Sequence, residues 1–101
     1  MNPERRNMYM EEIYTFVVST LASSCKVQPG DIEPTTNLFA DLGIDSVDFL
    51  DAVFCIEKHY DIRIPVGQWM SAVNEGNAAM TDYFVMEHFV AQIAARAAAS
   101  A

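Results

Sequence analysis

The sequence predicts an all-α fold with four helical segments, a long loop between the first and second, and a short third helix. Apolar residues recur every three or four positions in the first, second and last of these stretches, which is the spacing of one helix face. Turn-forming Pro, Gly, Asn and Thr residues gather between the stretches, and no region shows the alternation of a strand. With 101 residues, 51% of them hydrophobic, the chain forms one small domain spanning residues 1–101.

The first helix is predicted for "NPERRNMYMEEIYTFVVSTLASS", with Asn2 as N-cap and Pro3 in the first helical position. Periodicity is lost from Cys25 to Asp45, where a long loop is expected, and loops of this length in small domains are often functional. Either Asp45 or Ser46 caps a second helix that runs to about Tyr60.

The chain after Pro65 is predicted to form two more helices. A short one covers about Val66 to Val73 and ends before Gly76. The last begins with Thr81 as N-cap, and residues 97–101 are expected to fray because they have nothing to pack against. Its predicted buried stripe is Tyr83, Met86, Phe89, Val90 and Ile93.

Charge and composition exclude several classes of function. Six Lys and Arg against 14 Asp and Glu leave a net charge of −8, so nucleic acid and anionic membrane surfaces are repelled and basic partners are favoured. No apolar run is long enough to span a bilayer, and no signal-peptide pattern opens the chain. Cys25 and Cys55 form neither a disulfide framework nor a CxxC motif. We therefore expect a soluble protein of the reducing cytoplasm.

The second helix presents two apolar faces at about 100° per residue. One face carries Phe49, Ala52, Val53, Ile56 and Tyr60 and is expected to pack on the core. The second, rotated by roughly 140°, carries Val47, Leu50 and Phe54, with Asp48, Asp51 and Glu57 beside it. Four helices around one core bury one side of each, so this outward stripe indicates a docking surface. The alternative is that the short third helix covers Leu50 and Phe54.

Negative charge concentrates around the same stripe. Six acids lie between positions 41 and 61 against one clear base, Lys58. A solvated helix face would explain acids alone, but acids bordering an apolar stripe suit a partner with a basic rim and an apolar centre. The six are Asp41, Asp45, Asp48, Asp51, Glu57 and Asp61.

Patterns for catalysis and metal binding are absent from the sequence. The segment from Asp41 lacks the Gly and the final Glu of a calcium loop, and His59 and His88 have no companions at ligand spacing. Ser46 sits in neither a nucleophile elbow nor a phosphate loop. We expect no enzyme and no metal. A serine at a helix start is usually a cap, although a phosphodiester there would lie by the positive end of the helix dipole.

The stretch "DLGIDSVDFLDAVFCIEKHYDIRIP" closely resembles the modification region of acyl carrier proteins, with a D-L-G-x-D-S core and an I-x-I-P exit at Ile62 to Pro65. The resemblance implies a monomeric four-helix bundle of the acyl-carrier type, in which Ser46 carries 4′-phosphopantetheine and the thiol of that arm holds an acyl thioester. Val47 stands where that family usually has Leu. The implied recognition surface is Asp41, Ile44, Asp45, Val47, Asp48, Leu50, Asp51, Phe54 and Glu57.

The segment after the exit is similar to specialised carriers that hold very long acyl chains for lipid A. The features are Trp69, the turn at Glu75 and Gly76, and the "YFV" start of the last helix at Tyr83. The implied partners are a phosphopantetheinyl transferase, fatty-acid elongation enzymes and a lipid A acyltransferase. The residues expected to shield the acyl chain are Phe49, Val53, Ile56, Trp69 and Phe89.

Two other functions are compatible with the sequence. A carrier for polyketide or peptide synthesis would use the same Ser46 with different partners. An unmodified helical adaptor would use only the acidic and apolar stripe for protein binding.

Overall fold

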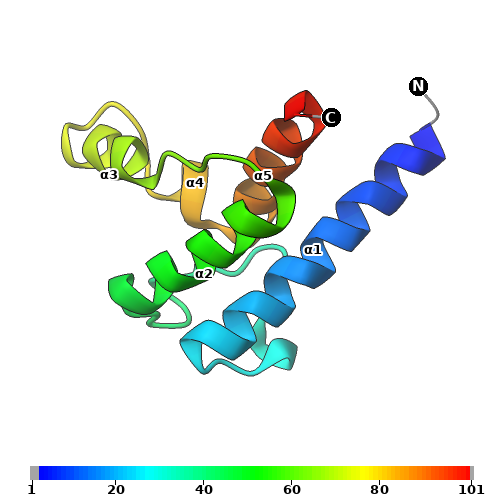
Figure 1. The fold of residues 1–101 in the computed structure, drawn as a ribbon. Coiled ribbons are helices and arrows are strands. Elements are labelled where there is room, and N and C mark those ends of the chain that lie inside the picture. Colours follow the sequence, from blue (N-terminus) through cyan, green and yellow to red (C-terminus); the bar gives the residue numbers. More distant parts are fainter. Residues whose placement is uncertain (1–2, 101) are drawn as a thin grey trace.

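The structure is a computed structural model that describes residues 3–100, with side chains for residues 9–98. Figure 1 shows α1 lying along α2 and α5, while α3 is set apart on the far side of α2. Among the described residues there is no strand, only one isolated β-bridge, so the all-α prediction is confirmed. The elements are α1 (Pro3–Cys25), a 3₁₀ turn η1 (Pro29–Asp31), α2 (Ser46–Tyr60), α3 (Val66–Asn74), α4 (Thr81–Phe84) and α5 (Met86–Ser100).

The helices pack through the faces that their periodicity predicts. Ile13, Val17 and Leu21 of α1 are fully buried against α2 and α5. The predicted N-cap Asn2 lies outside the described residues. The stripe predicted for the last helix is also buried, except for the half-buried Tyr83.

The predicted single last helix is wrong in one respect, because it is divided at Val85. Val85 is extended (φ −81°, ψ 135°) and forms a bridge with Asn37 of the long loop. The N–H of Leu38 donates to the Phe84 carbonyl at 2.9 Å, and the N–H of Met86 donates to the Thr36 carbonyl at 2.8 Å. These hydrogen bonds to the loop interrupt the helical pattern, so α4 and α5 are separate elements.

The ends of the last two helices also differ from the sequence prediction. Met80 occupies the N-cap position of α4, and Thr81 is its first residue. The carboxylate of Asp82 accepts a hydrogen bond from the N–H of Ala79 at 2.9 Å, which ties down the entry to the helix. At the other end α5 runs to Ser100 with Ala97 buried, so helix covers most of the segment expected to fray; Ala101 lies outside the described residues.

One cluster of aromatic side chains joins the loop to three helices. The Phe49 ring of α2 lies 5.1 Å from Phe39 of the loop, 5.9 Å from Phe84 of α4 and 5.4 Å from Phe89 of α5, measured between ring centroids. The pairs with Phe39 and Phe84 are edge-to-face and the pair with Phe89 is tilted, and such aromatic contacts stabilise the core beyond the area that they bury. Phe49 therefore fixes both the position of α2 and its rotation about its own axis.

The long loop turns into α2 through Gly43, which has a φ of +63°. A side chain at this φ costs roughly 1–2 kcal/mol. We expect Gly43→Ala to lower the free energy of unfolding by about that amount, as measured by urea denaturation followed by circular dichroism. The control is Gly67→Ala within α3, where an added Cβ meets no atom within 4 Å. That change gains up to about 1 kcal/mol of helix propensity. Equal effects of the two substitutions would contradict the assigned backbone at Gly43.

Candidate functional site

The site is built on the first turn of α2, and Asp45 rather than Ser46 caps this helix. Asp45 has extended backbone angles (φ −69°, ψ 140°), and its Oδ1 accepts a hydrogen bond from the N–H of Val47 at 2.7 Å. Its carbonyl accepts from the N–H of Phe49 at 2.9 Å, which begins the helical ladder. Ser46 is the first helical residue and is exposed. Its hydroxyl is therefore not needed for capping and faces solvent.

The loop before Asp45 is held by its own side chains. Oδ1 of Asn37 accepts hydrogen bonds from the N–H groups of Phe39 (3.0 Å) and Ala40 (2.9 Å). Oδ2 of Asp41 accepts from the N–H of Asn37 at 2.8 Å. Asp41 is exposed, as predicted for the recognition surface, but its carboxylate also stabilises the turn.

The outward stripe of α2 is exposed in the structure. Val47 retains 65% of its accessible surface, Leu50 40% and Phe54 60%. The opposite face is buried, with Phe49, Ala52, Val53 and Ile56 in the core. The alternative in which the third helix covers Leu50 and Phe54 is therefore wrong, because α3 lies beside this stripe without closing over it.

A groove of about 590 Å³ lies between α2 and the start of α3. Leu50 and Phe54 line it from α2, with Val53 and Glu57 beside them. On a helix with about 100° per residue, Ser46, Leu50, Val53 and Glu57 all fall within about 60° of one another, so Ser46 lies at the head of the groove face. The rest of the lining comes from the segment after α2: Arg63, Ile64, Pro65, Val66, Gly67 and Gln68.

Sequence reasoning placed the I-x-I-P exit but missed this segment's part in the groove. The alternation of Arg63 with the buried Ile62 and Ile64 is the signal that could have indicated it. Glu57 explains why the segment returns to α2, because its Oε2 accepts a hydrogen bond from the N–H of Ile64 at 2.7 Å. This half-buried carboxylate, predicted for the recognition surface, thus holds one wall of the groove to the other.

The prediction that Ile44 belongs to the recognition surface is wrong. Ile44 is buried, and its N–H donates to the Leu38 carbonyl at 3.4 Å. The physical reason is the turn at Gly43, after which the chain directs Ile44 into the core cluster just before α2 begins.

The acids Asp48 and Asp51 lie on a different side of α2 from the groove. At about 100° per residue they are rotated by roughly 140–160° from Ser46. Both are close enough to the buried thiol of Cys25, at the end of α1, to act on it electrostatically. Burial, and then the charges of Asp48 and Asp51, raise the pKa of Cys25 to about 11. The acidic part of the predicted recognition surface therefore faces the α1 side of the helix.

The five residues predicted to shield an acyl chain are all buried: Phe49, Val53, Ile56, Trp69 and Phe89. Phe49 and Phe89 are in ring contact, as are Trp69 and Phe89. Of the five, Val53 lines the groove directly, while the other four form the core behind it.

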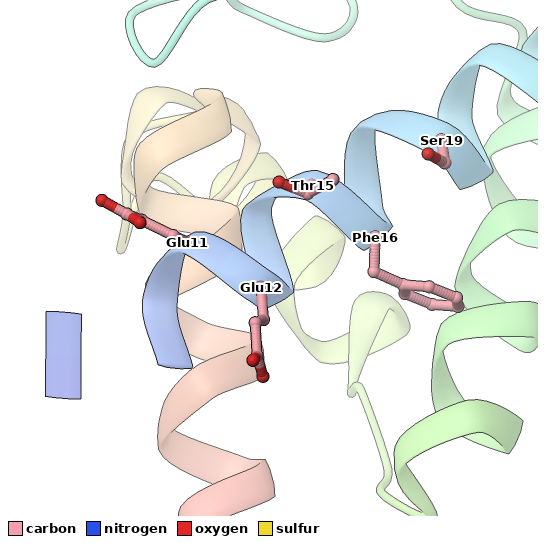
Figure 2. A pocket seen from close by; sticks show the side chains of 5 residues that line it. All are labelled: Glu11, Glu12, Thr15, Phe16 and Ser19. Atoms are coloured by element: carbon pink, nitrogen blue, oxygen red, sulfur yellow. The ribbon is translucent and has the colours of Figure 1, made fainter. Parts of the chain in front are cut away.

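A second hollow, of about 570 Å³, lies on α1 beside the far end of α2 (Figure 2). It is lined by Glu11, Glu12, Thr15, Phe16 and Ser19, and Figure 2 shows Phe16 directed toward α2. There the Phe16 ring stacks on His59, with ring centroids 3.9 Å apart. This hollow shares no lining residue with the groove, so the two are separate.

The described residues form no metal site, and neither histidine stands in a cluster of metal-ligating side chains. Within residues 3–100 no three His, Cys, Asp or Glu side chains come together as metal ligands. His88 is exposed and its Nδ1 lies 2.7 Å from the Thr81 carbonyl, while His59 is stacked on Phe16. No helix in this part of the chain combines the length and the apolar character needed to cross a bilayer.

Comparison with known proteins defines the class to which this fold and site belong. Residues 15–74 match the family described as "Phosphopantetheine attachment site", and they include the whole groove and the first turn of α2. The class is thus a carrier whose prosthetic group is phosphopantetheine, and proteins of this class are carriers rather than catalysts.

Individual relatives indicate which kind of phosphopantetheine carrier the chain resembles. The chain is 40% identical over 90 residues to "Acyl carrier protein AcpXL" of Mesorhizobium japonicum, covering 89% of this chain and 97% of that protein. It is 42% identical over 77 residues to the protein of the same name from Rhizobium meliloti, covering 76% and 81%. It is also 36% identical over 58 residues to "Acyl carrier protein" of Prochlorococcus marinus, covering 57% and 72%. The chain belongs to the acyl carrier protein family.

The division of roles between Asp45 and Ser46 gives a stability prediction. We expect Asp45→Ala to lower the free energy of unfolding by about 1 kcal/mol, because the N–H of Val47 loses its cap. Ser46→Ala should change it by no more than about 0.5 kcal/mol, because this surface position makes no capping bond. Urea denaturation of both variants gives the comparison. A Ser46→Ala variant as unstable as Asp45→Ala would show that the hydroxyl is the cap.

The two cysteines should differ in reactivity. At pH 8 we expect iodoacetamide to modify the exposed Cys55 in the folded protein. Cys25 should remain unmodified, because its thiol is buried and protonated at that pH. The folded state keeps the Cys25 proton that the unfolded state loses above pH 9.0, so stability should fall as pH rises from 9.0 to about 11. Peptide mapping after alkylation makes the measurement, with Cys55→Ser as control. Rapid labelling of Cys25 at pH 8 would contradict this placement.

Proposed function

We propose that Ser46 is the attachment residue for 4′-phosphopantetheine and that the protein carries acyl groups as thioesters between enzymes of the cytoplasm. The observation that carries the proposal is that Ser46 is exposed and does not cap the helix, because Asp45 is the cap. Ser46 also lies at the head of the groove between α2 and α3. The bound arm supplies a thiol that holds the acyl group.

The first turn of α2 suits a phosphodiester on Ser46. The helix macrodipole places partial positive charge there, and the N–H groups of the first turn have no partners within the helix. Asp48, the nearest acid inside the helix, is rotated by about 160° from Ser46, so its charge does not face the phosphate. The Asp45 carboxylate accepts a hydrogen bond from the N–H of Val47.

The groove suits the first part of an acyl chain. Leu50, Val53 and Phe54 on one wall and Ile64, Pro65 and Val66 on the other are apolar. Each methylene buried among them contributes roughly 0.8 kcal/mol. Because two of these residues, Leu50 and Phe54, are also exposed, an enzyme that covers the outward stripe would compete with the groove for the chain.

The partners follow from the surface and the family. Members of this family act with a phosphopantetheinyl transferase and with enzymes of acyl-chain metabolism. For this chain we propose a transferase, fatty-acid elongation enzymes and an acyltransferase, each presenting basic groups to Asp48 and Asp51 and an apolar centre to Val47, Leu50 and Phe54. The names of the relatives and the features at Trp69 and Glu75–Gly76 support very long chains for lipid A as the cargo.

Modification of Ser46 can be tested by mass. We expect incubation with coenzyme A and a broad-specificity phosphopantetheinyl transferase to add one phosphopantetheine to the wild-type chain, because Ser46 is exposed and free of capping bonds. Ser46→Ala should show no increment. The control is Ser71→Ala, an exposed serine within α3. Intact-mass spectrometry measures the result, and an unmodified wild-type chain would favour the adaptor alternative.

A further inference from the structure

Trp69 lies at the centre of a second aromatic cluster, between α3 and the last two helices. It is 4% exposed, and its ring is stacked on Tyr83 of α4 with centroids 4.9 Å apart and an interplanar angle of 4°. The guanidinium carbon of Arg96 lies 5.5 Å from the centroid of the Trp69 ring. The rings of Phe84 and Phe89, steeply inclined to the Trp69 ring, complete the surroundings, with centroid distances of 6.1 Å and 6.3 Å.

This cluster is the main attachment of α3 to the rest of the molecule. Figure 1 shows α3 apart from the α1, α2 and α5 helices, and its backbone makes few close approaches to any other element. Its two buried side chains are Val66 and Trp69. Since Val66 begins the helix at the groove, the position of the rest of α3 depends mainly on Trp69, with the partly buried Met70 and Val73 packed beside it.

Trp69 and one residue of the groove share a side of α3. Val66 lines the groove, and Trp69 follows three residues later on the same buried side of α3. On α2, Val53 lines the groove while Phe49, one turn away, is in the core behind it. A chain that passes between Leu50 and Val66 and continues inward therefore meets the Trp69 cluster.

We propose that Trp69 ends the acyl groove and sets how many carbons of the chain the folded protein can bury. Shorter chains stop in the groove, in front of the ring. Longer chains enter the core only when Trp69 leaves its stack with Tyr83 and α3 moves away from α4. Trp69 is thus a specificity-determining residue, and this inference rests on the proposed carrier function.

The contacts of Trp69 favour the closed arrangement. Parallel stacking on Tyr83 and the cation over the ring are both attractive, and both are lost when the ring moves out. Arg96 is held in place, since its Nη1 donates to the Gln92 carbonyl at 3.2 Å and to Gln92 Oε1 at 2.6 Å. A packed ring of this kind is either in its site or displaced, which predicts a threshold in chain length rather than a gradual response.

The sequence contains one tryptophan, so its fluorescence reports this residue alone. The experiment loads Ser46 with saturated acyl-pantetheine arms of increasing length and records tryptophan emission and Tm for each form. We expect emission to stay constant up to a threshold length and then to shift to longer wavelength, and the gain in Tm per added carbon to stop at the same length.

Three variants test the assignment. In Trp69→Ala the gain in Tm should continue to longer chains than in the wild type. In Tyr83→Leu, which keeps the fluorophore, the shift in emission should begin at a shorter length. The control is Met70→Ala, which shortens the neighbouring half-buried residue of α3 and should leave the threshold unchanged.

The outcomes separate the two proposals. Emission that is constant at all lengths, or a Trp69→Ala plateau at the wild-type length, would overturn the role of Trp69 while leaving the carrier function in place. Failure of every form to accept an arm at Ser46 would overturn the carrier function and this inference together.

Discussion

The packing of Phe49 against three other phenylalanine rings determines how α2 is oriented, and the site depends on that orientation. Phe39, Phe84 and Phe89 come from the loop, α4 and α5, so a single side chain of α2 is held from three directions. With Phe49 turned inward, the helical period of about 100° per residue places Ser46, Leu50 and Phe54 on the outer side that faces α3. Rotation of α2 by one residue would bury the serine or expose the core. The exposure of Ser46 in the first turn is thus a consequence of the packing of Phe49, three residues later in the chain.

The acids around α2 do not form one uniform surface. Asp41, Asp45 and Glu57 accept hydrogen bonds from backbone N–H groups and stabilise the turn, the helix start and the wall of the groove. Asp48, Asp51 and Asp61 remain to supply charge for a partner. Asp48 and Asp51 lie on the α1 side, opposite the groove, and Asp61 is exposed at the C-terminal end of the helix. In the proposed function, a docking enzyme would meet negative charge along one edge of α2 and apolar surface along the other, with the exposed Val47 side chain between them. Asp48 and Asp51 would steer a basic partner while their charges lie away from Ser46, and the neighbouring Asp45 carboxylate accepts a hydrogen bond from the N–H of Val47.

Local patterns in the sequence predicted the helices, the core face of α2 and its exposed stripe, because each depends on periodicity within one segment. They could not predict the break at Val85, since that depends on hydrogen bonds with loop residues nearly fifty positions earlier. The family resemblance places Ile44 on the recognition surface, but its burial depends on the direction in which the Gly43 turn sends the chain. Asp45 and Ser46 were both plausible caps, and only the backbone geometry distinguishes them. The groove combines α2 with residues 63–68, so no single stretch of sequence describes it.

The central claim is that cargo attached at Ser46 occupies the groove between α2 and α3. Comparison of ¹H–¹⁵N spectra of the protein carrying the bare arm and the protein carrying an acylated arm tests this residue by residue. The account predicts that amide shifts change at Val53, Ile64, Val66 and Gly67 and remain unchanged at Glu11, Thr15 and Ser19 of the α1 hollow. Changes at the α1 hollow with an unaffected groove would contradict it.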